Sequence, residues 1–133
     1  MDCGLEGSDR TAATGDVCNK TGTYLHALAA RASDSPCYVA LPESSIDWNC
    51  ASGDEIPIEE RGEEEVLAIT GMGSGGELGK VNLAAPGSRA YNPAFDITPA
   101  GLLRALVTEH GVIESSPRGL ARLRAQISSS SPM

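Results

Sequence analysis

Aromatic residues are scarce in this sequence of 133 residues, which holds one Trp, three Tyr and one Phe. A compact core must therefore be built from Ala, Leu, Val and Ile, as in many layered α/β proteins. Long apolar runs are also missing, because none approaches the roughly 18 residues that a membrane span requires. We therefore expect no membrane insertion, and the length predicts one modest domain.

Basic residues are outnumbered, with 10 Lys and Arg against 18 Asp and Glu, which gives a formal net charge of -8. A field of this sign repels phosphate backbones, so the composition disfavours nucleic-acid binding. A small anionic substrate stays compatible with the composition, because a few local donors outweigh a distant net charge.

Cysteine is present four times, but no two cysteines form a C-x-x-C pair, and only two histidines accompany them. This set does not predict a metal site. The four thiols could pair as two disulfides, but no secretory signal precedes them and the chain is not rich in cysteine. We expect reduced thiols in a cytoplasmic protein.

The first third of the sequence has the pattern of a parallel α/β sheet. Residues 3–5 read as the end of a strand, and residues 37–41 form a short apolar run that Pro42 ends, as in a buried strand. Between them we predict a helix over residues 17–32, with Asp16 as its N-cap. Its buried face would be formed by residues at the i, i+3, i+4 and i+7 positions. These are Leu25, Leu28, Ala29 and Ala32.

The rest of the chain predicts a hairpin, a helix and a tail. Residues 66–70 and 81–85 would form the hairpin around a glycine-rich tip. The tip satisfies G-x-G-x-x-G over residues 71–76, but Gly79 and Pro86 follow too soon for the helix of a dinucleotide site.

Thr98 and Pro99 predict a helix start, with Gly111 as its end. Beyond that helix, Leu120, Leu123 and Ile127 suggest only a short further helix, and we expect residues 128–132 to be disordered.

Three polar residues suggest a ligand site. Asp9 follows the first predicted strand, and Asn19 and Lys20 would lie in the first turn of the next helix, where free N–H groups attract anions. A carboxylate, an amide and an ammonium group together suit a polyol phosphate. The alternative is that Asp9 and Arg10 form a surface ion pair while Lys20 is simply solvated.

The stretch GSDRTAATGDVCNKTGTY, residues 7–24, is similar to the G-A-D-R-x-A-x-N-G-D-x-A-N-K-x-G-T-Y stretch of methylthioribose-1-phosphate isomerases. Further blocks of this family follow in order and with family-like gaps. They are PCYVA at residues 36–40, SSID at 44–47, GDEIPIEER at 53–61, NPAFDITPA at 92–100 and TEHGV at 108–112.

This resemblance implies a Rossmann-like α/β domain over residues 1–113, with a small β-hairpin, followed by a partly disordered tail over residues 114–133. It implies aldose–ketose isomerisation of 5-methylthioribose 1-phosphate without metal or organic cofactor, and a homodimeric enzyme. By the same resemblance Asp9 matches the catalytic acid/base, and Asn19 and Lys20 match substrate-binding residues. We also expect Arg10 and Asp96 to support these residues.

The family's catalytic cysteine and arginine-rich phosphate contacts belong to a segment upstream of these blocks, and this sequence does not contain them. We therefore expect the chain to be inactive alone and to associate with the missing N-terminal part or with a second copy. A rival reading is a non-catalytic subunit like those of the exchange factor for initiation factor 2. Those subunits resemble the family distantly but lack the Asp-Arg pair and the IPIEER block, both of which are present here.

Overall fold

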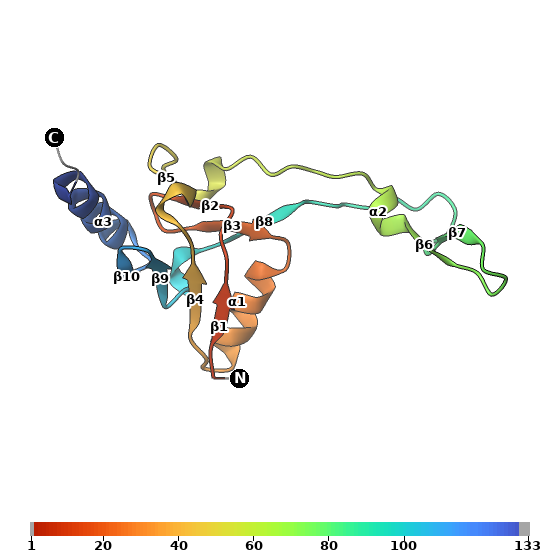
Figure 1. The fold of residues 1–133 in the computed structure, drawn as a ribbon, viewed down its shortest axis with the longest axis horizontal. Helices are drawn as coiled ribbons and strands as arrows, with labels where there is room; N and C mark the ends of the chain where they lie inside the picture. Colours follow the sequence, from red (N-terminus) through yellow and green to blue (C-terminus); the bar gives the residue numbers. More distant parts are fainter. Residues whose placement is uncertain (1, 131–133) are drawn as a thin grey trace. The chain divides into compact units, whose positions relative to one another are not determined.

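A computed structural model describes residues 2–130, which form two compact units. Unit 1 combines residues 2–57 with residues 95–130, and unit 2 is the excursion over residues 58–94 (Figure 1). We describe each unit by itself.

The main sheet of unit 1 has the strand order β1-β4-β9-β10. Strand β4 pairs in parallel with β1 on one side and with β9 on the other, whereas β10 runs antiparallel to β9. The strands are β1 (Gly4–Glu6), β4 (Cys37–Ala40), β9 (Ala105–Thr108) and β10 (Gly111–Ile113). The parallel α/β arrangement expected from the sequence is confirmed, as are the strands expected near residues 3–5 and 37–41.

A second sheet of unit 1 has the order β5-β2-β3-β8. Strands β2 and β3 form an antiparallel hairpin, β5 joins β2 in parallel, and β8 joins β3 in antiparallel orientation. The strands are β2 (Arg10–Ala12), β3 (Val17–Lys20), β5 (Ile46–Asp47) and β8 (Phe95–Thr98). Short 3-10 turns lie at η1 (Glu43–Ser45), η2 (Gly53–Glu55) and η3 (Ala100–Leu102).

Two helices cover the core of unit 1. Helix α1 (Thr23–Ala32) contributes Ala27 and Ala30, and helix α3 (Pro117–Ser130) contributes Leu120 and Leu123. Aliphatic residues on the strands of the main sheet and directly next to them complete the cluster, as expected for a chain with so few aromatic residues. They include Val39 on β4, Leu41 after it, Leu103 before β9 and Leu106 on β9.

Unit 2 is built around the hairpin predicted from the sequence. A single helical turn, α2 (Glu64–Leu67), leads into β6 (Ala68–Met72), which pairs antiparallel with β7 (Leu78–Asn82). The glycine-rich run forms the tip, and a strand follows it instead of the helix that a dinucleotide fingerprint requires. The two ends of unit 2 also pair, because Glu60 bridges Pro93 and the Ala94 N–H donates to the Glu59 carbonyl over 2.8 Å.

Three expectations about local structure differ from the structure. The helix predicted over residues 17–32 begins only at Thr23, because the preceding residues form β3 and pair with both β2 and β8. The helix predicted from Thr98 is absent, and its apolar residues lie instead on η3 and β9. In both places pairing with strands distant in sequence prevails over a local helical pattern.

The third difference concerns residues 114–133, which the sequence analysis assigns to a partly disordered tail. The segment is helical from Pro117 to Ser130, and it is held to the core by Leu120 and Leu123. Residues 131–133 lie outside the described residues. Among the helices of residues 2–130, none has the length and apolar character needed to cross a bilayer.

Candidate functional site

Asp9 lies in the loop after β1, immediately before β2. Its N–H donates to the Cys18 carbonyl over 2.9 Å. The hairpin pairs Arg10 with Cys18, so Asp9 is bonded to the residue that directly precedes Asn19. The backbone at Asp9 is thus joined to β3 next to Asn19 by a hairpin and not at a helix terminus.

Asn19 and Lys20 are the last two residues of β3. The Asn19 amide nitrogen donates to the Thr23 hydroxyl over 3.0 Å, and a Cβ at Gly7 would lie 4.0 Å from the Asn19 amide oxygen. The Asn19 side chain therefore lies between the start of α1 and the loop that carries Asp9. Lys20 is exposed, and no ion pair found within residues 2–130 involves it.

Asp96 holds the junction between β3 and α1 in place. It pairs with Asn19 across the β3–β8 ladder, and its carboxylate accepts the Gly22 N–H over 2.7 Å and the Tyr24 N–H over 3.2 Å. Gly22, the N-cap of α1, has a φ of 113° and supplies no capping side chain of its own. Asp96 therefore caps α1 from a neighbouring strand and fixes the backbone directly after Lys20.

The start of α1 does not provide the free anion site that the sequence analysis expects. The Gly22 and Tyr24 N–H groups that would face an anion are already bonded to Asp96. Asn19 and Lys20 also precede the helix instead of lying in its first turn. Their positions near Asp9 come from the β2–β3–β8 sheet.

An open pocket of about 410 Å³ is lined by Asp9 and Arg10 and by residues from η1 to the loop after β5. The latter are Ser44, Ser45, Ile46, Asp47, Trp48 and Asn49. An Arg10 guanidinium nitrogen lies 3.7 Å from an Asp47 carboxylate oxygen. Asp9 therefore lines this pocket, whereas Asn19 and Lys20 are not among its lining residues.

The four thiols are free, as expected, and Cys18 is the one next to the site. Burial raises the pKa of the Cys18 thiol, and the negative charge of Asp9 adds to the effect, while Arg10 opposes it. Burial likewise raises the pKa of Cys37, with the charge of Glu6 as a further cause. Both thiols are therefore held in the neutral form and suit packing better than nucleophilic attack.

Asp16 is an important residue that sequence reasoning placed wrongly. It is not an N-cap, because it lies in the turn between β2 and β3. One carboxylate oxygen accepts the Ala100 N–H over 2.9 Å, and the other accepts the Gly53 N–H over 3.1 Å and the Thr14 hydroxyl over 2.7 Å. Burial opposes its charge, but these three donors prevail and lower the pKa of Asp16.

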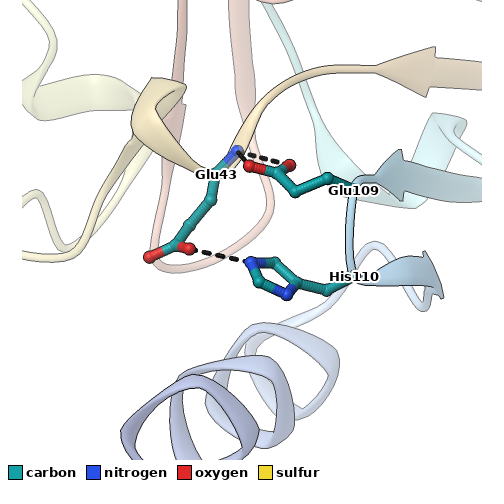
Figure 2. A group of neighbouring side chains, drawn as sticks. All are labelled: Glu43, Glu109 and His110. Atoms are coloured by element: carbon teal, nitrogen blue, oxygen red, sulfur yellow. Dashed lines mark hydrogen bonds and ion pairs between the residues drawn. The ribbon is translucent and has the colours of Figure 1, made fainter. Parts of the chain in front are cut away.

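A second group of side chains, Glu43, Glu109 and His110, was not predicted from the sequence (Figure 2). Their nearest ligand atoms lie within 4.8 Å of one another, the kind of set that could hold a cation. Both Glu109 oxygens, however, accept the Glu43 N–H, at 2.9 and 3.2 Å, and a Glu43 oxygen lies 2.8 Å from His110 Nε2. The groups thus satisfy one another and join η1 to the β9–β10 turn.

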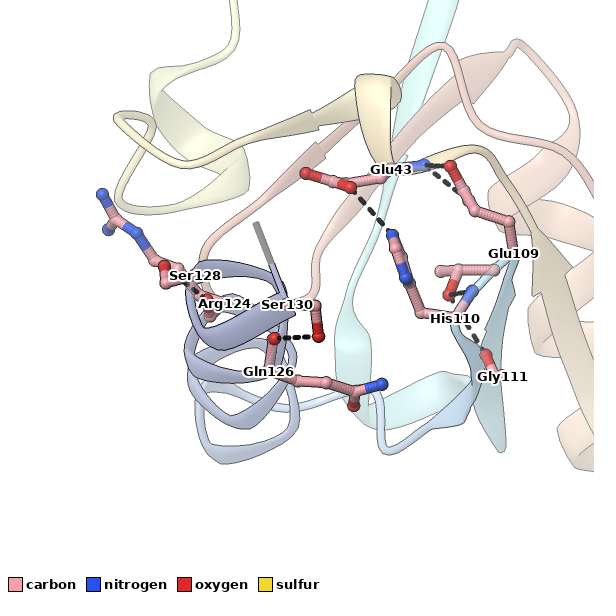
Figure 3. Close-up of polar contacts among 9 residues, drawn as sticks. Glu43, Glu109, His110, Gly111, Arg124, Gln126, Ser128 and Ser130 are labelled. Carbon is pink, nitrogen blue, oxygen red and sulfur yellow. Dashed lines mark hydrogen bonds and ion pairs between the residues drawn. The ribbon is translucent and has the colours of Figure 1, made fainter. Parts of the chain in front are cut away.

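Thr108 holds the β9–β10 turn, in which Figure 3 labels Glu109, His110 and Gly111. Its hydroxyl accepts the His110 N–H over 3.1 Å and donates to the Gly111 carbonyl over 3.2 Å. Backbone donors, its own N–H and that of Glu43, lower the pKa of Glu109, and His110 adds to the shift. No sequence pattern indicates this group, because Glu43 lies 66 residues from Glu109.

Comparison with known proteins identifies relatives over most of the chain. Residues 1–115 match the model of the initiation factor 2 subunit family. The chain is 53% identical over 124 residues to a methylthioribose-1-phosphate isomerase of Sinorhizobium medicae, and 54% identical over 122 residues to one of Methylocella silvestris. These matches cover 92% and 91% of this chain but 34% and 33% of the relatives, so the chain spans about a third of their length.

Solved structures give the same picture. The 5-methylthioribose 1-phosphate isomerase from Pyrococcus horikoshii matches with a TM-score of 0.80 and 41% identity, over 95% of this chain and 33% of that one. The delta subunit of the translation initiation factor eIF-2B from A. fulgidus matches with a TM-score of 0.75 and 36% identity, over 91% of this chain and 34% of that one. The fold expected from the sequence, that of a domain shared by the isomerases and these subunits, is confirmed.

Proposed function

Because this chain belongs to the initiation factor 2 subunit family, we propose that it is part of a methylthioribose-1-phosphate isomerase of methionine salvage. The reaction would interconvert 5-methylthioribose 1-phosphate and 5-methylthioribulose 1-phosphate. The observation that carries this proposal is 53% identity to a curated isomerase over 124 residues, which is 92% of this chain. The comparisons support the family, and the roles given below to single residues are our proposal.

Asp9 is the proposed proton donor. The ring oxygen of the sugar must take up a proton as its bond to C1 breaks. C1 then gains the hydrogen that C2 loses, and the 2-hydroxyl group releases its proton as C2 becomes the carbonyl carbon. A carboxylic acid next to the ring oxygen serves the first step by general acid catalysis. The position of Asp9 at the start of a paired strand favours this role, because its N–H is bonded to Cys18 and its backbone is thereby fixed.

Asn19 and Lys20 are the proposed binding residues. The Asn19 amide donates and accepts hydrogen bonds and therefore suits the sugar hydroxyls, whereas the exposed Lys20 ammonium suits an oxyanion. Asp96 supports both residues by fixing the turn that follows them, and Arg10 supports Asp9 by joining β2 to the β5 segment through Asp47.

We propose that this chain does not turn over substrate alone. Asp9 is exposed and the adjoining pocket is open, so water reaches the acid freely. Efficient proton transfer to a sugar requires that water be excluded. The complete enzyme would be a cytoplasmic homodimer. In it, the missing enclosure would come from the two thirds of the isomerase that have no counterpart in this chain.

A chimaera tests this proposal. The 124 residues that match the Sinorhizobium medicae isomerase would replace the corresponding segment of that enzyme. We expect the chimaera to isomerise 5-methylthioribose 1-phosphate, and Asp9→Asn to lower its kcat by about 100-fold or more. Asp34→Asn is a matched control, because Asp34 is exposed at the end of α1 and Asn tolerates its φ of 53°. An active Asp9→Asn chimaera would refute the assigned role.

A second candidate function is that of a non-catalytic subunit, which the similarity to the A. fulgidus eIF-2B delta subunit favours. Titration calorimetry of the chimaera with the sugar phosphate separates the two. Binding that is weakened by Lys20→Ala supports the isomerase, and absence of binding in a folded chimaera supports the non-catalytic subunit.

A further inference from the structure

Three segments meet at the edge of the main sheet where its parallel strands end. Strands β1, β4 and β9 run parallel, and in such a sheet ligands bind beyond the carboxyl ends of the strands. Asp9 lies in the loop after β1, η1 follows β4, and Glu109 and His110 form the turn after β9. The side chains of Figure 2 therefore lie at the same edge of the sheet as Asp9. Neither η1 nor these side chains belong to the residues assigned above to the reaction.

The start of η1 is bound by β9 and by the turn after it. The Leu41 N–H donates to the Val107 carbonyl over 2.9 Å and continues the β4–β9 ladder. Pro42 has no N–H to donate. The next N–H, that of Glu43, donates to both Glu109 oxygens, at 2.9 and 3.2 Å. Every N–H group available between the end of β4 and the first residue of η1 is thus bound by this part of the sheet.

A side-chain contact connects the same two segments. A Glu43 carboxylate oxygen lies 2.8 Å from His110 Nε2, so the backbone and the side chain of one residue both bind the turn (Figure 2). The turn is itself fixed, because the Thr108 hydroxyl bonds both the His110 N–H and the Gly111 carbonyl. The β9–β10 turn is therefore a rigid support for η1.

The other end of η1 is held by the hairpin next to Asp9. Strand β5 follows η1 directly and pairs in parallel with β2, the strand that begins directly after Asp9. Between these two supports lie Ser44 and Ser45, which line the same pocket of about 410 Å³ as Asp9. No hydrogen bond within residues 2–130 uses either hydroxyl. The wall of the pocket thus presents two uncommitted hydroxyl groups, on a segment that is fixed at both ends.

We propose that Ser44 and Ser45 hydrogen-bond to oxygen atoms of the sugar phosphate, and that Glu109 is a positioning residue that holds η1 in place for this contact. The inference rests on the proposed function, because it takes Asp9 as the proton donor. A serine hydroxyl accepts from a sugar hydroxyl and donates to a phosphate oxygen, so either part of the substrate suits the pair.

Glu109 would act through η1 and not by contact with substrate. It does not line the pocket, and its carboxylate is occupied by the Glu43 N–H. A binding group that is ordered in advance avoids the entropy cost of being ordered when the substrate binds. Loss of Glu109 should therefore weaken substrate binding without removing any group that touches the reacting atoms.

Kinetics of the chimaera test the proposal. Glu109→Ala should raise the KM for 5-methylthioribose 1-phosphate by about fivefold to tenfold and change kcat by less than about threefold. Glu109→Gln, which keeps an acceptor oxygen for the Glu43 N–H, should restore most of the affinity. The double variant Ser44→Ala, Ser45→Ala should raise KM at least as much as Glu109→Ala. Glu114→Ala is the matched control, because Glu114 is exposed directly after β10.

Hydrogen exchange of the isolated chain gives a readout that needs no activity. Glu109→Ala should accelerate exchange at the Glu43 amide by about tenfold or more and leave α1 unchanged, because only η1 loses its support. A lower thermal midpoint with an unchanged KM would show a purely structural role and overturn the proposal. The serine variant keeps the test valid if Glu109→Ala does not fold, because neither hydroxyl is bonded within the described residues.

Failure of this proposal is distinguishable from failure of the proposed function. An active chimaera whose KM tolerates both the serine and the Glu109 variants would keep the reaction and refute the role of η1. A folded chimaera that neither converts the sugar phosphate nor binds it in calorimetry would refute both. Where the sugar phosphate binds without turnover, its dissociation constant replaces KM as the quantity that the same variants must raise.

Discussion

Asp16 shows how one carboxylate connects parts of the chain that lie far apart in sequence. One of its three donors comes from its own turn. The other two come from η2 and η3, at residues that lie 37 and 84 positions further along the chain. No local pattern reveals such a role. The sequence shows only an Asp before an apolar run, which is also the signature of a helix N-cap.

We predict that Asp16→Ala lowers the free energy of unfolding by about 2 kcal/mol, since two backbone N–H groups lose a charged acceptor. Asp16→Asn should have a smaller effect, because an amide oxygen still accepts. Urea denaturation provides the measurement, and Asp54→Ala, at an exposed residue of η2, is the control. Equal midpoints for Asp16→Ala and the wild type would contradict this.

The pH dependence follows from the lowered pKa of Asp16. The contribution of the ionised carboxylate to stability is fully present above its ordinary value of 3.8, and it is lost as the pH falls through the lower value of the folded state. The difference in stability between wild type and Asp16→Ala should therefore be constant near neutral pH and shrink below about pH 4.

Thiol reactivity gives a second prediction at this scale. Cys3 is exposed, whereas Cys18, Cys37 and Cys50 are buried, and burial raises the pKa of the first two of these three. At pH 8 iodoacetamide should modify Cys3 rapidly and the other thiols only after denaturation, because burial blocks access to all three and little thiolate forms at Cys18 and Cys37. Peptide mass spectrometry identifies the modified residues, and rapid labelling of Cys18 in the folded chain would contradict the burial described here.

At the scale of elements, the start of α1 depends on a residue that lies outside the helix. Asp96 belongs to β8, yet it accepts the N–H groups of Gly22 and Tyr24. The position of β8 therefore determines where the helix begins. The capped turn also fixes the backbone at Asn19 and Lys20, because both residues lie directly before it.

We predict that Asp96→Ala costs about 1 kcal/mol of stability, the usual effect of losing an N-cap. Hydrogen exchange should accelerate at the amides of Gly22 and Tyr24 and change little in α3. In the chimaera the variant should raise the KM for the sugar phosphate more than it lowers kcat, because Asp96 positions binding residues and does not touch the reacting atoms. Asp96→Asn, which keeps an acceptor, should restore most of the exchange protection.

The elements predicted correctly are those whose signal is local. The strand of residues 37–40 is a continuous apolar run ended by Pro42, and the hairpin of unit 2 has a glycine-rich tip between two apolar runs. The β3–α1 and β8–β9 segments were misread, because a short strand followed by a turn and an apolar stretch resembles one longer helix. Only pairing between β3 and β8, about 77 residues apart, decides against that reading.

For the site, the family resemblance pointed to Asp9, Asn19 and Lys20 but not to their arrangement. Asn19 and Lys20 lie on β3, which pairs with β8 at Asp96, and the Asp9 N–H is bonded to Cys18 of β3. Their catalytic and binding roles remain predictions. The missing information was geometric, since the sequence does not reveal that Asp96 occupies the helix N-terminus or that Asp9 lies on the wall of a separate pocket.

At the scale of the molecule, α3 stabilises unit 1 as a whole. Leu120 and Leu123 are 1% exposed and contact the same cluster as β4 and β9. The guanidinium of Arg124 also lies 5.7 Å from the centre of the Trp48 ring, which joins the helix to the segment after β5. A segment expected to be a tail is thus part of the core.

We predict that Leu120→Ala lowers the free energy of unfolding of unit 1 by about 2–5 kcal/mol, through lost burial and a residual cavity. Leu83→Ala is the matched control, because Leu83 is 64% exposed in unit 2 and the same substitution there should change stability by less than about 0.5 kcal/mol. Urea denaturation followed by circular dichroism measures both. A small effect at Leu120 would mean that α3 is dispensable.

The two ends of unit 2 are paired with each other, and this pairing makes the unit replaceable. Because Glu59 and Ala94 are joined by a backbone hydrogen bond and Glu60 bridges Pro93, the chain enters and leaves unit 2 through two neighbouring segments. Closing such a gap needs only a tight turn of a few residues, and the entropy of closure grows slowly with the length of whatever is inserted. Evolution or protein engineering could therefore shorten unit 2, lengthen it or replace it with a foreign domain while the remaining fold keeps its connections.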